Sequence, residues 1–353
     1  MISIIALLGC IQTVSLYGVK FIYLSPVLVL FYLRNLNKEF FFIVGAWLVW
    51  GVIVADNKIE AVQVAIYMTL LALGANVLHH TLSETVLKWM VLMNVLSIIG
   101  FLSIFLTDFS DLIQIYDPRV ARTTRDNSIY MFGFLDFPTL RLNWFNVDPN
   151  VGAYNLLILQ VTVTSRLKNI NLSLLRASWI SLIIVVMLSQ SRGALLALSL
   201  YGFWLLYSEY LRNKPHMVLA VLILFIGLLV GLLLLRGGLE FERIDKWAHY
   251  IDKLNKFDYW IGKGLMFDIR IWGGLSSHNS FIMMIFYVGV LPTVLLLFIP
   301  IVNLINGNKL AIRHFITAII GLMTLDLLFS LGFWLTLLAL YENNNFFSRA
   351  SRI

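Results

Sequence analysis

Long apolar runs follow one another along this 353-residue chain and constrain its fold more than any other feature. The runs are continuous, as in Val218–Leu235 and Ser181–Leu188, and lack the alternation of a membrane β-strand. Hydrophobic residues make up 60% of the chain and charged residues only 13%. Because a spanning helix needs about 20 mostly apolar residues, the sequence predicts an all-α, polytopic membrane protein.

We predict about twelve transmembrane helices, with about ten as the lower bound because the first two runs and the last are short. The predicted spans are Ile2–Tyr17, Phe21–Leu33, Phe40–Ala55, Ala61–Leu78, Val86–Leu106, Val151–Ser165, Leu174–Ser189, Ala194–Tyr210, Met217–Leu235, Ser280–Leu304, Ala311–Leu328 and Phe329–Tyr341. No separate soluble domain is visible, so 1–353 is expected to form a single integral membrane domain.

Two polar stretches, roughly 107–149 and 236–277, are too long for tight helix–helix connections. Loops of that length tend to be functional. The second should contain an amphipathic helix on the membrane surface, because its apolar residues recur at helical spacing. Those residues are Phe241, Ile244, Trp247, Ala248, Ile251 and Leu254.

Basic residues concentrate in alternate short loops, and this bias predicts how the chain is oriented in the membrane. With the N-terminus inside, the cytoplasmic loops and tail contain Arg34, Lys38, Lys88, Arg166, Lys168, Arg176, Arg212, Lys214, Lys309, Arg313, Arg349 and Arg352. The positive-inside rule therefore places both termini in the cytoplasm and both long loops outside, in the periplasm of a Gram-negative cell. The net charge of +7 reflects this topology and does not indicate nucleic-acid binding.

Residues 189–194, Ser-Gln-Ser-Arg-Gly-Ala, form the sharpest local motif and lie between two apolar runs on the expected outer side. The guanidinium of Arg192 can hold phosphate oxygens through its planar fork, and a helix that starts here would favour an anion. The alternative interpretation is an interfacial arginine whose side chain extends to the aqueous boundary.

Two other polar segments directly precede apolar runs. Residues 276–280, Ser-Ser-His-Asn-Ser, open the run to Leu304, and the imidazole of His278 suits proton removal from an acceptor hydroxyl near neutral pH. Residues 148–150, Asp-Pro-Asn, open the run that begins at Val151. Both segments are also typical helix starts, so capping is the alternative for each.

Several classes of chemistry have no motif in the chain. The sequence lacks an Asp-x-Asp pair to hold a metal on a diphosphate, a phosphate-binding glycine loop and a Gly-x-Ser-x-Gly elbow. We therefore expect no cofactor and no metal. The interleaved charges of the second long loop are mostly expected to form a solvated surface, with Arg243 as the exception.

The order and placement of these motifs resemble the O-antigen polymerase and O-antigen ligase superfamily. The resemblance covers roughly 146–289. It rests on Asp-Pro-Asn at 148–150, Ser-Arg-Gly-Ala at 191–194, Arg243, Trp247, Gly-Lys-Gly at 262–264, Ser-His-Asn-Ser at 277–280 and Gly289.

The resemblance implies a metal-independent, membrane-embedded glycosyltransferase of the GT-C-like type in the bacterial inner membrane. Arg192 and Arg243 match the arginines expected to hold the donor diphosphate, and His278 matches the histidine expected to activate the acceptor. Further substrate-binding candidates are Asn279, Asn150 and Arg270. The implied donor is an oligosaccharide on undecaprenyl diphosphate, and a chain-length regulator protein and membrane lipids are further partners.

Three alternatives remain open. A polymerase extends glycan on a second lipid-linked repeat unit, whereas a ligase transfers it to lipid A–core, and the small size of the chain favours the polymerase. A transporter or flippase would typically show two related halves, which this sequence does not. A non-catalytic scaffold of a glycan-export complex would tolerate loss of both Arg192 and His278.

Overall fold

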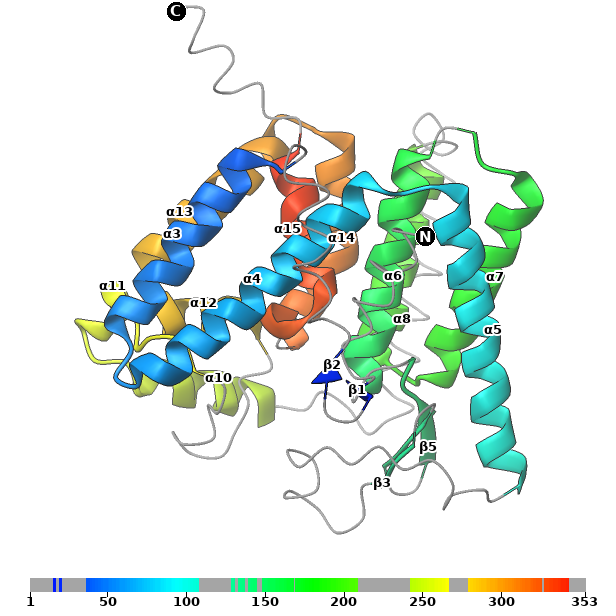
Figure 1. Cartoon of the computed structure of the whole chain (residues 1–353), viewed down its shortest axis with the longest axis horizontal. Helices are drawn as coiled ribbons and strands as arrows, with labels where there is room; N and C mark the ends of the chain where they lie inside the picture. The colour runs from blue at the N-terminus through cyan, green and yellow to red at the C-terminus, as the bar shows by residue number, and fades with distance from the viewer. Residues whose placement is uncertain are drawn as a thin grey trace, which may run out of the picture.

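The computed structural model describes residues 15–16, 19–20, 36–107, 128–130, 133–136, 139–144, 148–167, 169–208, 242–266, 279–325 and 327–342. This part of the chain is mostly helical (Figure 1). Its helices are α3 (Lys38–Val54), α4 (Lys58–His80), α5 (Glu84–Thr107), α6 (Pro149–Arg166), α7 (Leu172–Leu188), α8 (Arg192–Leu206), α10 (Glu242–Asp252), α11 (Asp258–Ile261), α12 (Ser280–Val288), α13 (Val290–Ile305), α14 (Lys309–Thr324) and α15 (Leu331–Tyr341), with the 3-10 turn η5 (Leu327–Phe329).

Short strands accompany the helices, and the all-α prediction omitted them. An antiparallel pair consists of β1 (Ser15–Leu16) and β2 (Val19–Lys20). A three-stranded antiparallel sheet in the first long loop consists of β3 (Ser128–Tyr130), β4 (Gly133–Asp136) and β5 (Thr139–Leu142). In its register Phe134 lies opposite Ile129 on one side and Arg141 on the other.

Most of the predicted apolar runs correspond to described helices. By length and composition α4 and α5 can each cross a membrane, and the pair α13 and α14 would add a third if this bent unit counts as one span. Helices α7, α8 and α15 are apolar but shorter. Most of the first two predicted runs and the whole of Met217–Leu235 lie outside the described residues. A membrane-associated helical protein is therefore supported, whereas twelve spans stay a prediction.

Helices α6 and α15 form the centre of the bundle. Every residue of α15 is buried, and α15 packs against α4, α6, α13 and α14. In α6 a continuous buried segment extends from Gly152 to Val163. Asn155 Oδ1 accepts a hydrogen bond from the backbone N–H of Gly332 at 3.0 Å, which fixes the start of α15 against α6. A helix that is buried all round needs this kind of central position.

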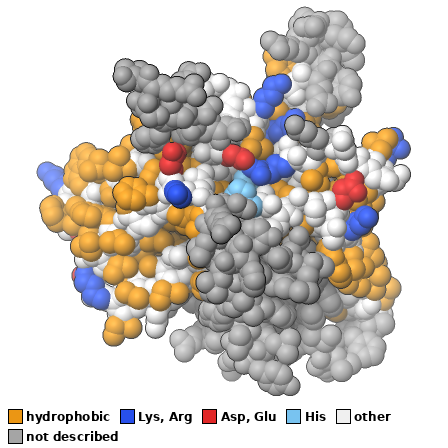
Figure 2. Space-filling model, turned by 45° about the horizontal axis from the view of Figure 1, so that its top comes forward, with side chains coloured by type: hydrophobic (Ala, Val, Ile, Leu, Met, Phe, Trp, Pro, Cys, Tyr) orange, Lys and Arg blue, Asp and Glu red, His pale blue; other side chains and the backbone are white. Residues whose placement is uncertain are grey.

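The outer helices turn large apolar side chains away from the bundle. Phe42, Ile59, Phe105 and Ile305 are each at least two-thirds exposed. Figure 2 shows hydrophobic side chains along both flanks, whereas most of the visible charged side chains gather across the face turned forward from the top. Apolar patches of this extent mark contact with lipid or another protein in preference to water.

The two ends of the bundle differ in chemistry. The sheet β3–β5 lies beneath the starts of α6 and α8 in Figure 1, and we call this the sheet end. At the opposite end α4 finishes with His79 and His80, and we call this the histidine end. Helices α3, α5, α7 and α14 also begin there. Close to their starts lie four of the described basic residues that the topology prediction places on one side: Lys38, Lys88, Arg176 and Lys309.

The predicted span Ser280–Leu304 is wrong as a single helix. The structure breaks it at Gly289 into α12 and α13, because the φ of Gly289 is +83° and no helix can continue through that conformation. The preceding helix α12 has only nine residues and is too short to cross a bilayer.

The predicted amphipathic helix of the second long loop corresponds to α10, but its predicted apolar face is partly wrong. The structure buries Tyr250 and Leu254, whereas Ile251 is 40% exposed. Tyr250 stacks edge-on against Phe286 of α12 with ring centroids 5.5 Å apart. The helix therefore docks through Tyr250, a residue that the simple hydrophobic pattern left out.

Candidate functional site

The turn between α7 and α8 forms the centre of the candidate site. We call residues 189–192 the α7–α8 corner. Gln190 adopts a positive φ of 51°, one of two non-glycine residues in the described chain with this strained conformation. Ser191 then caps α8, its hydroxyl accepting from the N–H of Ala194 at 3.3 Å. Strain of this kind persists where surrounding contacts enforce it, and it clusters at functional sites.

A hydrogen bond from Arg141 of β5 holds the α7–α8 corner in this conformation. Its Nε donates to the backbone oxygen of Ser189 at 2.9 Å, and its Nη2 donates to Asn150 Oδ1 at 2.8 Å. The side chain is only 7% exposed. One buried guanidinium therefore joins the α7–α8 corner to the Asp-Pro-Asn motif, which are about 40 residues apart in the sequence.

No sequence motif singles out Arg141 among the arginines of the first long loop. Its bridge between a strand and two helix ends depends on residues that are distant from it in the sequence. The only sequence signal is that this arginine lies between two leucines, Leu140 and Leu142, in β5.

Replacing Arg141 with alanine should lower the free energy of unfolding by about 2 kcal/mol, because the buried backbone oxygen of Ser189 and the partly buried Asn150 Oδ1 then lose their donor. The measurement is the apparent melting temperature of the purified protein in detergent, which should fall by a few degrees. Arg176→Ala, at an exposed arginine in the first turn of α7, is the control. Equal melting temperatures for the two variants would refute the bridging role.

A second polar contact holds the same loop on α5 and α7. The indole Nε1 of Trp144 donates to Asn94 Oδ1 at 2.8 Å, and Asn94 Nδ2 donates to Ser181 Oγ at 3.0 Å. All three side chains are buried. Trp144 is the other non-glycine residue with positive φ, at 43°. Both strained residues thus lie where the first long loop docks on the bundle.

Arg192 follows this corner as the first residue of α8 and is half-buried. A cation at a helix N-terminus opposes the helix dipole, so Arg192 is unfavourable for the stability of α8 itself. An anion beside the same N-terminus would reverse that effect, because exposed N–H groups and the guanidinium then act together.

Several helices begin at the sheet end with a polar cap. Asp148 caps α6, Ser191 caps α8 and Ser330 caps α15. Asn279 caps α12, its Oδ1 accepting from the N–H groups of Phe281 and Ile282 at 3.0 and 3.1 Å. The sequence-based capping interpretations of 148–150 and 276–280 are confirmed for Asp148 and Asn279. Helix starts together at one end present positive dipole ends on the same side.

The two glycine motifs of the family resemblance meet in space. The N–H groups of Lys263 and Gly264 donate to the carbonyls of Phe286 and Tyr287 at 2.7 and 2.8 Å. These carbonyls belong to the last turn of α12, which the break at Gly289 leaves without helical donors. An added Cβ on Gly289 would lie 2.1 Å from the carbonyl oxygen of Trp260. Only glycine permits this approach.

Trp50 of α3 completes this junction. Its Nε1 donates to the carbonyls of Ile261 and Val288 at 3.0 and 3.2 Å. The backbone of Leu265 then bonds the carbonyl of Gly51 at 3.0 Å. The second long loop is thereby attached to α3 and to the break between α12 and α13, on the same side of the bundle as α10.

Some of the predicted site residues fall where the structure gives no description. His278 and Arg270 lie outside the described residues. Arg243 lies on α10, but its side chain is likewise outside the description. The expected convergence of Arg192, Arg243 and His278 thus stays a prediction, whereas Arg141 joins Asn150 to Ser189, three residues before Arg192.

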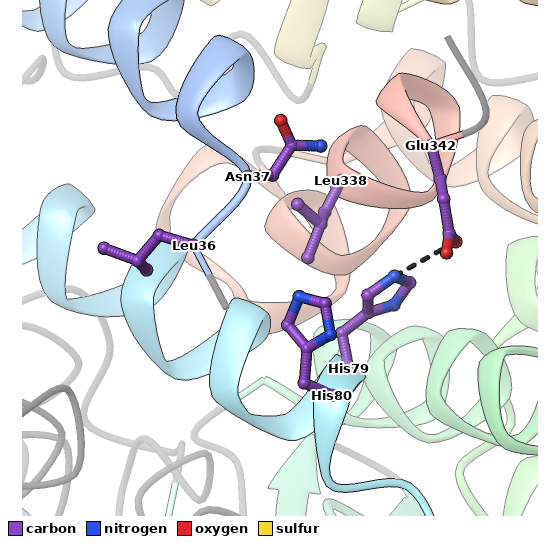
Figure 3. Close-up of a pocket in the computed structure, with 6 residues that line it drawn as sticks. All are labelled: Leu36, Asn37, His79, His80, Leu338 and Glu342. Atoms are coloured by element: carbon purple, nitrogen blue, oxygen red, sulfur yellow. Dashed lines mark ion pairs between the residues drawn. The ribbon is translucent and has the colours of Figure 1, made fainter. Parts of the chain in front are cut away.

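The histidine end holds a second polar cluster that the sequence did not reveal. His79 Nε2 pairs with Glu342 Oε2 at 3.1 Å, and Arg166 pairs with the other oxygen of the same carboxylate. Figure 3 shows the His79–Glu342 pair beside a pocket of about 280 Å³ that Asn37 and His80 also line. Glu342 directly follows α15, so the cluster ties the end of this central helix to α4 and α6.

Within the described ranges no group of three or more His, Cys, Asp or Glu side chains is arranged to hold a metal ion. Comparisons with protein-family models, with curated proteins and with solved structures found no match to this chain. Its functional assignment therefore rests on the residues and contacts described above.

Proposed function

We propose that this protein is a membrane-embedded glycosyltransferase that polymerises a surface polysaccharide of the O-antigen type. It transfers glycan from undecaprenyl diphosphate to a hydroxyl group of another lipid-linked repeat unit. In this proposal the sheet end faces the periplasm, both termini are cytoplasmic and the undescribed apolar runs supply the remaining spans. The transfer requires no metal ion.

The observation that carries the proposal is the bridge made by Arg141. It joins the α7–α8 corner to the Asp-Pro-Asn motif at one end of the bundle, and Arg192 is the last residue of that corner and the first of α8. A leaving diphosphate gains negative charge as the sugar–oxygen bond breaks. Preorganised guanidinium groups and helix N-termini stabilise such charge without a metal.

In the proposed reaction the acceptor hydroxyl oxygen attacks the anomeric carbon of the donor sugar. His278 takes the hydroxyl proton, and the bond between the anomeric carbon and the diphosphate oxygen breaks, so that undecaprenyl diphosphate leaves. Arg192 and Arg243 hold the diphosphate. Arg141, Asn150 and Asn279 have positioning roles, since their side chains hold the corner and the start of α12.

The deciding experiment gives purified protein a lipid-diphosphate repeat unit in the presence of EDTA. Glycan chains longer than one repeat unit are expected, because no step depends on a divalent ion. Transfer to added lipid A–core without chain growth would identify a ligase instead. No product with either acceptor would overturn the glycosyltransferase assignment.

A further inference from the structure

An apolar groove lies between α8 and α14. Its volume is about 220 Å³, and its lining has almost no polar surface. The lining residues are Leu200, Phe203, Trp204, Tyr207, Phe315, Ile316 and Ile319. They belong to the last two turns of α8 and the middle of α14, so the groove lies toward the histidine end, where α8 finishes and α14 begins.

Arg313 lies beside this groove, next to its lining residue Trp204. It lies three residues before Ile316 on α14, and its guanidinium carbon is 5.5 Å from the centroid of the Trp204 ring. Its Nε is buried and has no hydrogen-bond partner within the described structure. A buried donor that lacks an acceptor costs free energy that an anion would recover. Lys309, four residues earlier and exposed, adds a second positive charge on a neighbouring position of the helix surface.

The apolar lining of the groove and the basic residues beside it indicate what kind of molecule binds there. An aromatic and aliphatic lining accepts a hydrocarbon chain, whereas Arg313 and Lys309 require a negative group at one end of it. A molecule with both features is an anionic phospholipid. Basic pockets between spanning helices at the cytoplasmic side bind such headgroups. The described basic residues predicted to be cytoplasmic also lie at the histidine end.

We propose that one anionic phospholipid binds here, with an acyl chain between α8 and α14 and its phosphate on Arg313. The cation–π contact with Trp204 preorients the guanidinium for this phosphate. The site lies toward the end of α8 opposite to Arg192 and does not depend on glycan transfer. A lipid bound there stabilises the α8–α14 pair, because a ligand that binds only the folded state shifts the unfolding equilibrium.

The test is native mass spectrometry of the full-length protein after delipidation in detergent. Phosphatidylglycerol and phosphatidylcholine with identical acyl chains are titrated separately. We expect a one-to-one adduct with phosphatidylglycerol at about tenfold lower lipid concentration than with phosphatidylcholine, as one charge-assisted phosphate contact would give. Arg313→Gln should remove this preference, whereas Arg176→Gln, at an exposed arginine of the same end, should retain it.

Equal binding of the two lipids by the unsubstituted protein, or an unchanged preference in Arg313→Gln, would overturn the proposal. The predicted span 217–235 is the competing occupant. The chain has one cysteine, Cys10, so a Cys10→Ser variant has no other thiol that could react with an introduced cysteine pair. A disulfide between Ile316→Cys and Phe225→Cys would show that the chain itself fills the groove, which also rejects lipid binding.

Discussion

Gly289→Ala should destabilise the folded protein by at least about 3 kcal/mol, although it adds only one methyl group. Backbone strain and a steric clash both contribute to this loss of stability. The backbone of Gly289 has a φ of +83°, which an alanine adopts only with strain. The new Cβ would also lie 2.1 Å from the carbonyl oxygen of Trp260, a backbone atom that cannot rotate away.

The consequence extends beyond the helix break. Relieving the clash requires the strip 260–265 to move, and this strip provides the donors for the last carbonyls of α12. Helix α12 begins at Ser280, the last residue of the Ser-His-Asn-Ser motif. Under the proposed function, a displaced α12 should therefore also impair catalysis. The variant is expected to show both a lower melting temperature and a loss of chain growth.

Gly45→Ala is the matched control. It lies inside α3, where an added Cβ meets no atom within 4 Å. Alanine is the better helix former, so this variant should be as stable as the parent protein or slightly more stable. Thermal unfolding of both variants in the same detergent measures the difference. Similar melting temperatures for Gly45→Ala and Gly289→Ala would show that the junction tolerates rearrangement.

The sequence predicted the helices well where apolar periodicity and caps agree. Runs such as Ala61–Leu78 and Val86–Leu106 lie within α4 and α5, and the structure extends each by a few residues. The cap predicted from Asp-Pro-Asn is also present at the start of α6. These features depend on residues close together in the chain, so they can be predicted from the sequence alone.

The structural features that could not be predicted depend on contacts between residues far apart in the sequence. An apolar run that crosses Gly289 gives no warning of a break, because the break needs the strip 260–265 to occupy the space. The sheet β3–β5 is short and lies in a loop with little periodicity. Arg141 acquires its role only when Ser189 and Asn150 come within reach. No local sequence pattern predicts these long-range hydrogen bonds.

Arg192→Ala should reduce the rate of glycan polymerisation by at least about 100-fold, a loss typical when one preorganised donor to a developing negative charge is removed. Under the proposed function the guanidinium stabilises the diphosphate as it leaves. The fold should persist, since Arg192 is half-buried and its charge opposes the dipole of α8. Activity and stability are thus expected to separate, unlike their joint loss in Gly289→Ala.

Arg192→Ala is compared with two further variants in the EDTA assay. Arg192→Lys keeps the charge but lacks the planar fork, so it should retain an intermediate rate. Arg176→Ala removes a cation from the histidine end and should leave the rate unchanged. If Arg192→Ala polymerises glycan as fast as Arg176→Ala while melting at the same temperature, Arg192 does not contact the diphosphate. The α7–α8 corner would then be a structural turn, and the catalytic arginine would have to be sought elsewhere in the chain.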